Sequence, residues 1–249
     1  MNNEGQTIIV DGEYYATNSA TLTTALKAGA TEVSLLPNTY VATKIGNGGG
    51  KTLTLRGLGE GVILDIDQTN AVALGTFDGS NVTFENMTIA TRGSLYKGFA
   101  RMEGTYVNCK FSKLYFTLRG THKFTKCEFD AESDEHCIWT YGADEIIFDE
   151  CKFNYSDRCV NVYTEMGVNV GNISFDNCAF NYIPKEKASF GAVEINSGSF
   201  KTSINLDFNK CTEPESGEMV FISAWDSTNG AKATVTIDGE VAELVQQPK

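Results

Sequence analysis

The sequence predicts an all-β protein, a single-domain solenoid of the parallel β-helix type, from three observations. The 249 residues include 24 glycines, 15 phenylalanines and 10 tyrosines but only 4 prolines, a composition that suits many short strands. A short motif of aromatic residues and cysteine recurs along the middle of the chain. Within each copy, apolar residues alternate with polar residues, which is the pattern of a strand with one buried face.

Composition and charge limit the possible functions. Hydrophobic residues make up 41% of the chain, which is enough for a continuous core, so we do not expect a disordered protein. The 32 acidic residues outnumber the 20 lysines and arginines, and the net charge of −12 would repel a phosphate backbone. We therefore expect no binding to nucleic acid.

The N-terminus shows neither a basic segment nor an apolar run long enough for a signal peptide. No later segment approaches the ~18 consecutive apolar residues that a membrane span needs. We expect no export by a signal of the chain's own and no membrane insertion. The 7 cysteines are odd in number, and outside an oxidising compartment most of them should be reduced.

The recurring motif consists of an aromatic residue, two polar positions, a cysteine, one further position and a second aromatic residue. The complete copies are Tyr106-x-x-Cys109-x-Phe111, Phe124-x-x-Cys127-x-Phe129, Phe148-x-x-Cys151-x-Phe153 and Phe175-x-x-Cys178-x-Phe180. Degenerate copies are Phe84-x-x-Met87-x-Ile89 and Phe208-x-x-Cys211. The interval between copies varies, which is typical of the coils of a strand-built solenoid and not of helical repeats. The two polar residues predict a corner between two strands.

A third family of strands is found when the copies are aligned by this corner. Its members are Phe116–Leu118, Ile138–Thr140, Val160–Val162 and Val193–Ile195. Each coil then contributes three strands to three sheets, which is what a parallel β-helix requires. The solenoid would extend over residues 31–211.

The N-terminal third fits the same architecture. Thr21–Gly29 is a short amphipathic segment that ends at a glycine, and it is followed by the strand-like segments Glu32–Tyr40 and Lys51–Asp65. With these features the chain resembles the pectin-lyase-like family of right-handed parallel β-helix proteins. The resemblance implies a right-handed coil, and it implies that Thr21–Gly29 is a short capping helix.

The resemblance also implies an order of segments. Residues 1–30 would include the capping helix, and residues 212–249 would close the solenoid, with a strand at Ala233–Ile237. Proteins of this fold include lyases, hydrolases, isomerases, phage tail and capsid proteins, and adhesins, so the fold does not imply one activity.

The cysteines of the corners are predicted to be small buried residues and not metal ligands or a redox relay. No Cys-x-x-Cys spacing occurs, and Met87 occupies the same position in the first copy. The spacing of neighbouring coils is compatible with a disulfide, so bridges stay possible. Cys137 and Cys159, beside the third strands, are expected to be the more exposed thiols. We predict no metal and no other cofactor.

Acid–base chemistry by paired carboxylates is the enzymatic alternative, because the chain has only two histidines, His122 and His136. The acidic candidates are the segment Asp130–His136 and the later residues Asp157, Glu165 and Glu194. The signature motifs of pectate-lyase-like and polygalacturonase-like members are absent. A polysaccharide lyase or glycoside hydrolase is therefore the alternative, and the main prediction names no catalytic residue.

Aromatic side chains on the third strands indicate a binding surface. If Ile138 and Thr140 point inward, Trp139 and Tyr141 point outward, and the alignment places further outward positions on the neighbouring coils. The predicted binding residues are Arg119, Trp139, Tyr141 and Tyr163. Flat aromatic faces beside guanidinium and amide groups suit a sugar ring or a protein interface.

Together these observations favour a non-enzymatic structural and interaction protein. A chain of this kind, without an export signal or a catalytic motif, is expected to be a bacteriophage virion component. It would be a capsid decoration or head-fibre protein or a tail receptor-binding protein, assembled in the host cytoplasm. Its partners would be virion proteins or a host surface glycan, and a homotrimer is plausible. A bacterial carbohydrate-binding surface module is a further alternative.

Overall fold

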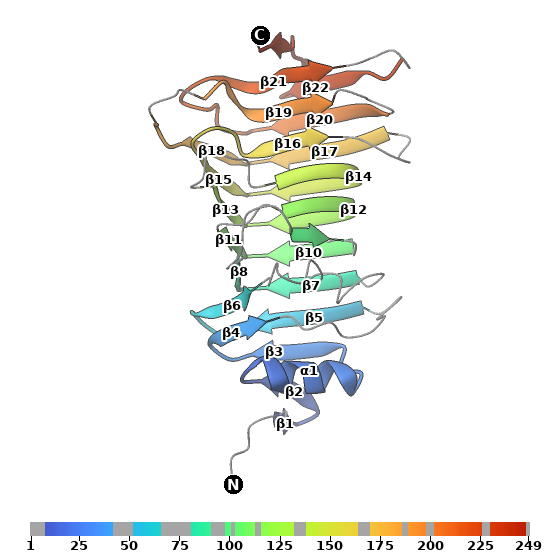
Figure 1. Cartoon of the computed structure of the whole chain (residues 1–249), viewed down its shortest axis with the longest axis vertical. Coiled ribbons are helices and arrows are strands. Elements are labelled where there is room, and N and C mark those ends of the chain that lie inside the picture. The colour runs from blue at the N-terminus through green and yellow to red at the C-terminus, as the bar shows by residue number, and fades with distance from the viewer. Residues whose placement is uncertain are drawn as a thin grey trace. The chain divides into compact units, whose positions relative to one another are not determined.

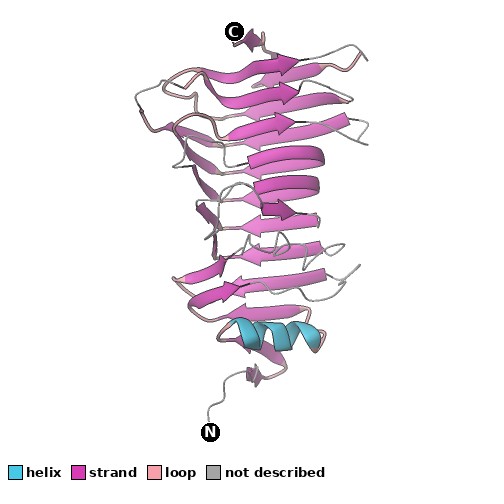
Figure 2. Cartoon of the chain, in the orientation of Figure 1, coloured by secondary structure: helices cyan, strands magenta, loops and turns pink. Residues whose placement is uncertain are grey.

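The computed structural model describes residues 8–41, 52–65, 81–90, 98–100, 103–112, 116–131, 138–163, 170–185, 189–197, 202–225 and 230–247. Strands make up most of this part of the chain, and one helix lies near its N-terminus (Figures 1 and 2). The predicted all-β class is confirmed, and the sheets are predominantly parallel. The chain divides into two compact units, Met1–Leu114 and Tyr115–Lys249.

The first unit contains two parallel sheets. Its elements are β1 (Ile8–Val10), β2 (Glu13–Ala16), α1 (Ser19–Lys27), β3 (Glu32–Leu35), β4 (Asn38–Val41), β5 (Thr52–Gly57), β6 (Val62–Asp65), β7 (Asn81–Glu85), β8 (Thr88–Ala90), β9 (Gly98–Ala100), β10 (Glu103–Val107) and β11 (Lys110–Ser112). One sheet has the order β2-β3-β5-β7-β10, and the other has the order β4-β6-β8-β11. Strand β1 is antiparallel to β2.

Helix α1 packs against β2 and begins at a capping box. The Asn18 side chain accepts a hydrogen bond from the Thr21 backbone N–H (3.0 Å), and the Thr21 hydroxyl accepts one from the Asn18 N–H (3.0 Å). Leu22 and Ala25 are buried on the inner face. The predicted helix is therefore present, and it begins two residues earlier than the sequence indicated because Asn18 caps it.

The second unit also consists mostly of parallel strands, which form three stacks. Its strands are β12 (Phe116–Thr125), β13 (Glu128–Ala131), β14 (Ile138–Asp149), β15 (Lys152–Tyr155), β16 (Val160–Tyr163), β17 (Val170–Asp176), β18 (Ala179–Tyr182), β19 (Gly191–Ser197), β20 (Ser203–Asn209), β21 (Glu218–Trp225), β22 (Ala233–Ile237), β23 (Glu240–Val241) and β24 (Val245–Gln246). One stack is β12-β14-β17-β20-β22, a second is β12-β14-β16-β19-β21-β24, and a third is β13-β15-β18, all parallel. Strand β22 is the closing strand predicted at Ala233–Ile237.

The register of the second stack agrees with the alignment by the cysteine corner. Phe116 pairs with Ile138, Ile138 with Val160, and Val160 with Val193. The structure continues this row to Val220 on β21. The predicted third strands and their pairing are thus confirmed.

Each corner turns through one residue in the left-handed conformation. These residues, with φ between 52° and 55°, are Asn86, Asn108, Lys126, Glu150, Asn177 and Lys210. Each directly precedes the methionine or cysteine of the motif. Four of these backbone N–H groups donate to a carbonyl of the next rung, as from Asn86 to the Val107 carbonyl (3.0 Å), and that of Lys210 donates to the Asp238 carboxylate (2.7 Å). At these five corners the turn therefore leaves the backbone N–H group paired.

The aromatic residues of the motif form stacked rows inside the second unit. Phe124, Phe148, Phe175 and Phe208 stack with ring centroids 5.0, 4.9 and 4.6 Å apart. A second row of Phe129, Phe153 and Phe180 has separations of 4.8 and 5.1 Å. All seven rings are buried, so these rows are the core of the unit.

Cys127, Cys151 and Cys178 are buried beside these rows, Cys109 is buried in the first unit and Cys211 is partly exposed, and the cysteines in the described residues are free thiols. Each thiol lies against the backbone, as where Cys178 donates to the Phe148 carbonyl (3.5 Å). The expectation that Cys159 is a more exposed thiol is wrong. Cys159 is buried and donates to the Ala192 carbonyl (3.1 Å), because the next rung covers it. Cys137 lies outside the described residues.

No helix in the described part of the chain is long and apolar enough to cross a lipid bilayer.

Candidate functional site

Two of the four predicted binding residues form a ring pair in the second unit. Trp139 on β14 and Tyr163 on β16 have ring centroids 5.5 Å apart and planes at 70°, and both are partly exposed. Ile138 and Thr140, on either side of Trp139, are buried. The Trp139 ring therefore belongs to the outer face of the stack, and its edge-to-face contact with Tyr163 fixes both rings.

The other two predicted residues are described only by their backbone. Tyr141 pairs with Tyr163 in the sheet register. The register between β12 and β14 shifts on both sides of Gly120, so Arg119 lies at an irregularity of the ladder. The side chains of Arg119 and Tyr141 lie outside the described residues, as do His136 and Glu165.

The outer face of the strands next to Trp139 is largely covered by other side chains. Trp139 pairs with Asn161, Asn161 with Glu194, and Glu194 with Phe221, so these four residues form one outer column. Exposure falls to 6% at Asn161, 4% at Glu194 and 3% at Phe221. The Phe190 ring packs edge-to-face on Phe221 at 5.2 Å. Between Asn161 and Phe221 the column is thus closed to solvent, whereas Trp139, the adjacent Tyr163 and Val245, which pairs with Phe221, are accessible.

A partly buried cluster of charged residues links the rungs at this covered part of the face. The Arg158 guanidinium forms salt bridges with Asp157 and with Glu194. The Ser223 hydroxyl donates to the other carboxylate oxygen of Glu194. Arg158 precedes β16, Glu194 is on β19 and Ser223 is on β21, so the cluster links three successive rungs.

This cluster brings together two of the acids that the sequence suggested for catalysis, Asp157 and Glu194. A glycosidase-type mechanism needs one carboxyl group that gives a proton and another that attacks or activates water. Both oxygens of Glu194 are already engaged, and its side chain is 6% exposed. The arrangement suits a structural link better than proton transfer. Asn161 beside it has a buried side-chain oxygen that accepts no hydrogen bond from the described residues.

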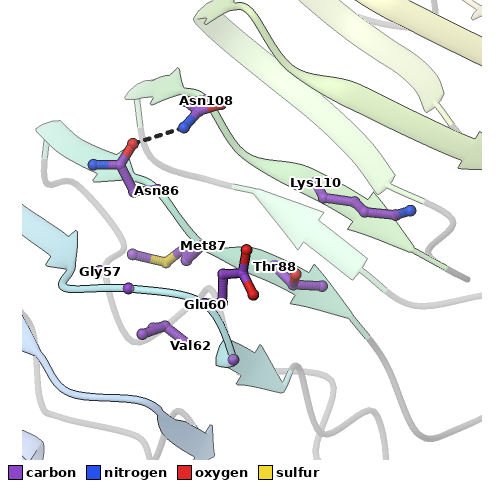
Figure 3. Close-up of a pocket in the computed structure, with 10 residues that line it drawn as sticks. Gly57, Glu60, Val62, Asn86, Met87, Thr88, Asn108 and Lys110 are labelled. Carbon is purple, nitrogen blue, oxygen red and sulfur yellow. Dashed lines mark hydrogen bonds between the residues drawn. The ribbon is translucent and has the colours of Figure 1, made fainter.

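Sequence reasoning missed a cavity in the first unit, shown in Figure 3. It has a volume of about 410 Å³ and lies at the corners between the two sheets. Its lining residues are Gly57, Gly59, Glu60, Gly61, Val62, Asn86, Met87, Thr88, Asn108 and Lys110. The sequence feature that could have indicated this cavity is the segment from Gly57 to Gly61, in which every second residue is glycine and which forms a longer corner than its neighbours.

The described residues include no group of three or more histidine, cysteine, aspartate or glutamate side chains arranged to hold a metal ion. The chain matches no protein-family model, no curated protein and no solved structure.

Proposed function

We propose that the protein is a right-handed parallel β-helix of the pectin-lyase-like type that acts by binding, as a bacteriophage virion component. The parallel rungs of each unit and the repeated left-handed corner support the helical coil. The virion assignment covers a capsid decoration or head-fibre protein and a tail receptor-binding protein. Its partner is another virion protein or a host surface glycan.

One observation supports binding above other functions. The Trp139–Tyr163 pair stays partly exposed, whereas Asn161, Glu194 and Phe221 in the same outer column are covered by packed side chains. Large aromatic rings at a partly open edge can become buried in a partner, and such residues commonly dominate interface energetics. The salt-bridged cluster next to the pair provides a rigid support, because its side chains are fixed by neighbours on three rungs.

The test replaces Trp139 and Tyr163 together by alanine. We expect loss of binding to the phage particle or host glycan, since each buried ring can contribute roughly 2 kcal/mol at a hot spot. Circular dichroism should show an intact fold, because neither ring belongs to the buried rows. Glu145→Gln, an exposed change elsewhere on β14, is the matched control.

Two results would contradict this proposal. The first is a folded double variant that binds as tightly as the parent. The second is the absence of the protein from purified phage particles by mass spectrometry, although the protein is abundant in the lysate from which the particles were purified.

A further inference from the structure

The cavity of the first unit results from corners of unequal length. Between β7 and β8, and again between β10 and β11, the chain turns in two residues, Asn86–Met87 and Asn108–Cys109. Between β5 and β6 it takes four residues, from Leu58 to Gly61. The longer loop lies beside the two short corners, and residues of the loop and of both corners enclose the cavity of about 410 Å³.

Glycine fixes the shape of this loop. Gly59 and Gly61 have φ values of 136° and 83°, which side-chain-bearing residues rarely adopt. A Cβ on Gly57 would lie 2.1 Å from the Asn86 carbonyl oxygen, so the loop leaves β5 in direct contact with the next corner. The cavity wall is therefore built into the backbone and does not depend on side-chain rotamers.

The polar groups of the cavity are oriented and still have bonding capacity. The Asn108 side-chain N–H₂ donates to the Asn86 side-chain oxygen at 2.9 Å, a bond drawn in Figure 3. Asn86 therefore keeps both of its N–H donors, and Asn108 keeps its oxygen as an acceptor. Figure 3 shows the Glu60 carboxylate between Met87 and Thr88. Glu60 is exposed and has no ion pair or hydrogen bond with the described residues.

The floor of the cavity is apolar. Val62 and Met87 lie in the lining but are almost fully buried, so they close the bottom of the cavity and leave a ligand to contact mainly the polar rim. An apolar floor with a few oriented polar groups is typical of small-ligand sites, and the volume is at the lower end of their range.

These groups select the chemistry of the ligand. Hydroxyl groups can donate to the Glu60 carboxylate and to the Asn108 oxygen and can accept from the Asn86 N–H₂ group. Glu60 and Lys110 both lie in the lining, so the cavity has one acidic and one basic side chain and favours a ligand without net charge. A purely apolar ligand would leave the amides unpaired.

We propose that this corner cavity binds a neutral saccharide, a mono- or disaccharide unit of a larger glycan. Glu60, Asn86 and Asn108 bind its hydroxyl groups, and Val62 and Met87 close the bottom of the cavity. The site lies within the first unit and does not depend on the Trp139–Tyr163 pair, so either proposal can fail without the other.

Nitrogen-15 NMR of the whole chain tests this directly. The probes are methyl α-glucoside, methyl α-galactoside, methyl α-mannoside and N-acetylglucosamine, each titrated to millimolar concentration. We expect at least one probe to shift the side-chain amide resonances of Asn86 and Asn108. Glu60→Gln, which keeps the shape but removes the charge, should weaken that binding about tenfold or more.

Two further variants complete the test. Thr88→Val removes a hydroxyl from the lining at nearly constant volume and should also weaken binding. Glu103→Gln, on β10 and outside the lining, should bind like the parent, and so should the Trp139/Tyr163 double variant. The proposal is overturned if no probe moves the two amide resonances. It is also overturned if folded Glu60→Gln and Thr88→Val proteins both bind with the parent affinity.

Discussion

At the scale of single residues, each motif corner needs one residue in the left-handed backbone conformation, and the six residues found there tolerate that conformation to different degrees. Asparagine is the residue other than glycine that best tolerates the left-handed conformation, and it occupies three of the six corners. The other three are Lys126, Glu150 and Lys210, which tolerate this conformation less well, although Lys126 and Glu150 form an ion pair with each other at 3.7 Å. These corners are therefore places where the protein can be stabilised.

Lys210→Asn should raise the free energy of unfolding by about 0.5–1 kcal/mol, because the corner becomes less strained. The Lys210 backbone N–H donates to the Asp238 carboxylate (2.7 Å), and the substitution keeps that bond. Urea unfolding measures the effect. Lys152→Asn, at an exposed position of β15, is the control and should give no gain. Equal effects at the two positions would contradict the role of the corner.

Glu194→Gln should lower the free energy of unfolding by about 2–3 kcal/mol, because Arg158 then loses its most buried carboxylate partner. The loss should stay below that of a fully buried pair, since Arg158 is partly exposed and retains Asp157. Glu145→Gln, at an exposed position, should change stability by less than about 0.5 kcal/mol.

The same variant separates a structural from a catalytic role for the carboxylates. We expect the parent protein to release no reducing ends from polysaccharides. A parent that cleaves a polysaccharide, together with an inactive Glu194→Gln variant of unchanged stability, would support the enzymatic alternative in place of the binding function.

At the scale of elements, the stacked corners align thiols as well as rings. Hydrogen bonding between neighbouring thiols, together with burial, raises the pKa of Cys151 and of Cys178 to about 12, against an ordinary value of 9.0. The neighbour that contributes most is Cys127 for the first thiol and Cys151 for the second. The row of corners therefore keeps its thiols protonated and unreactive.

This shift predicts how stability depends on pH. The unfolded thiols ionise near pH 9 and the folded ones near 12, so the unfolded state binds fewer protons between these values. The stabilising contribution is complete below pH 9 and is lost as the pH rises toward 12. Urea unfolding at several pH values should show this fall, and it should be shallower in a Cys151→Ala/Cys178→Ala variant.

A thiol reagent gives an independent check on the same thiols. Below pH 9, the native protein should react at these two cysteines only after unfolding. Rapid labelling of Cys151 or Cys178 in the native state would contradict the prediction.

At the scale of the whole molecule, assembly follows from the proposed function. The described surface includes exposed aliphatic side chains on β1, at Ile8, Ile9 and Val10, which are unfavourable in water and available for contact with another chain. Static light scattering should give a mass about three times the 27.1 kDa of one chain, which corresponds to a homotrimer. A monomer at micromolar concentration, with no affinity for a phage shell, would contradict both the trimer and the virion role.

The sequence by itself determined the strands, their pairing and the corners. The alternation of apolar and polar residues with period 2 is visible within a single strand. Alignment of the coils by their cysteine corners then predicts which strand residues are neighbours, and it places Phe116, Ile138, Val160 and Val193 in one row. The same alternation placed Trp139 on the outer face and Ile138 in the core. These features depend on a few consecutive residues, which is why they could be predicted.

Only the tertiary structure decided which outer positions are accessible. Alternation separates the two faces of a strand but does not show what packs on the outer one. Asn161 and Glu194 point outward and are nevertheless buried, because Arg158 and Ser223 reach Glu194 from other rungs. The corner cavity likewise depends on a loop at Leu58–Gly61 lying beside corners at Asn86 and Asn108. Burial and concavity arise from residues distant in the chain, so no local pattern contains them.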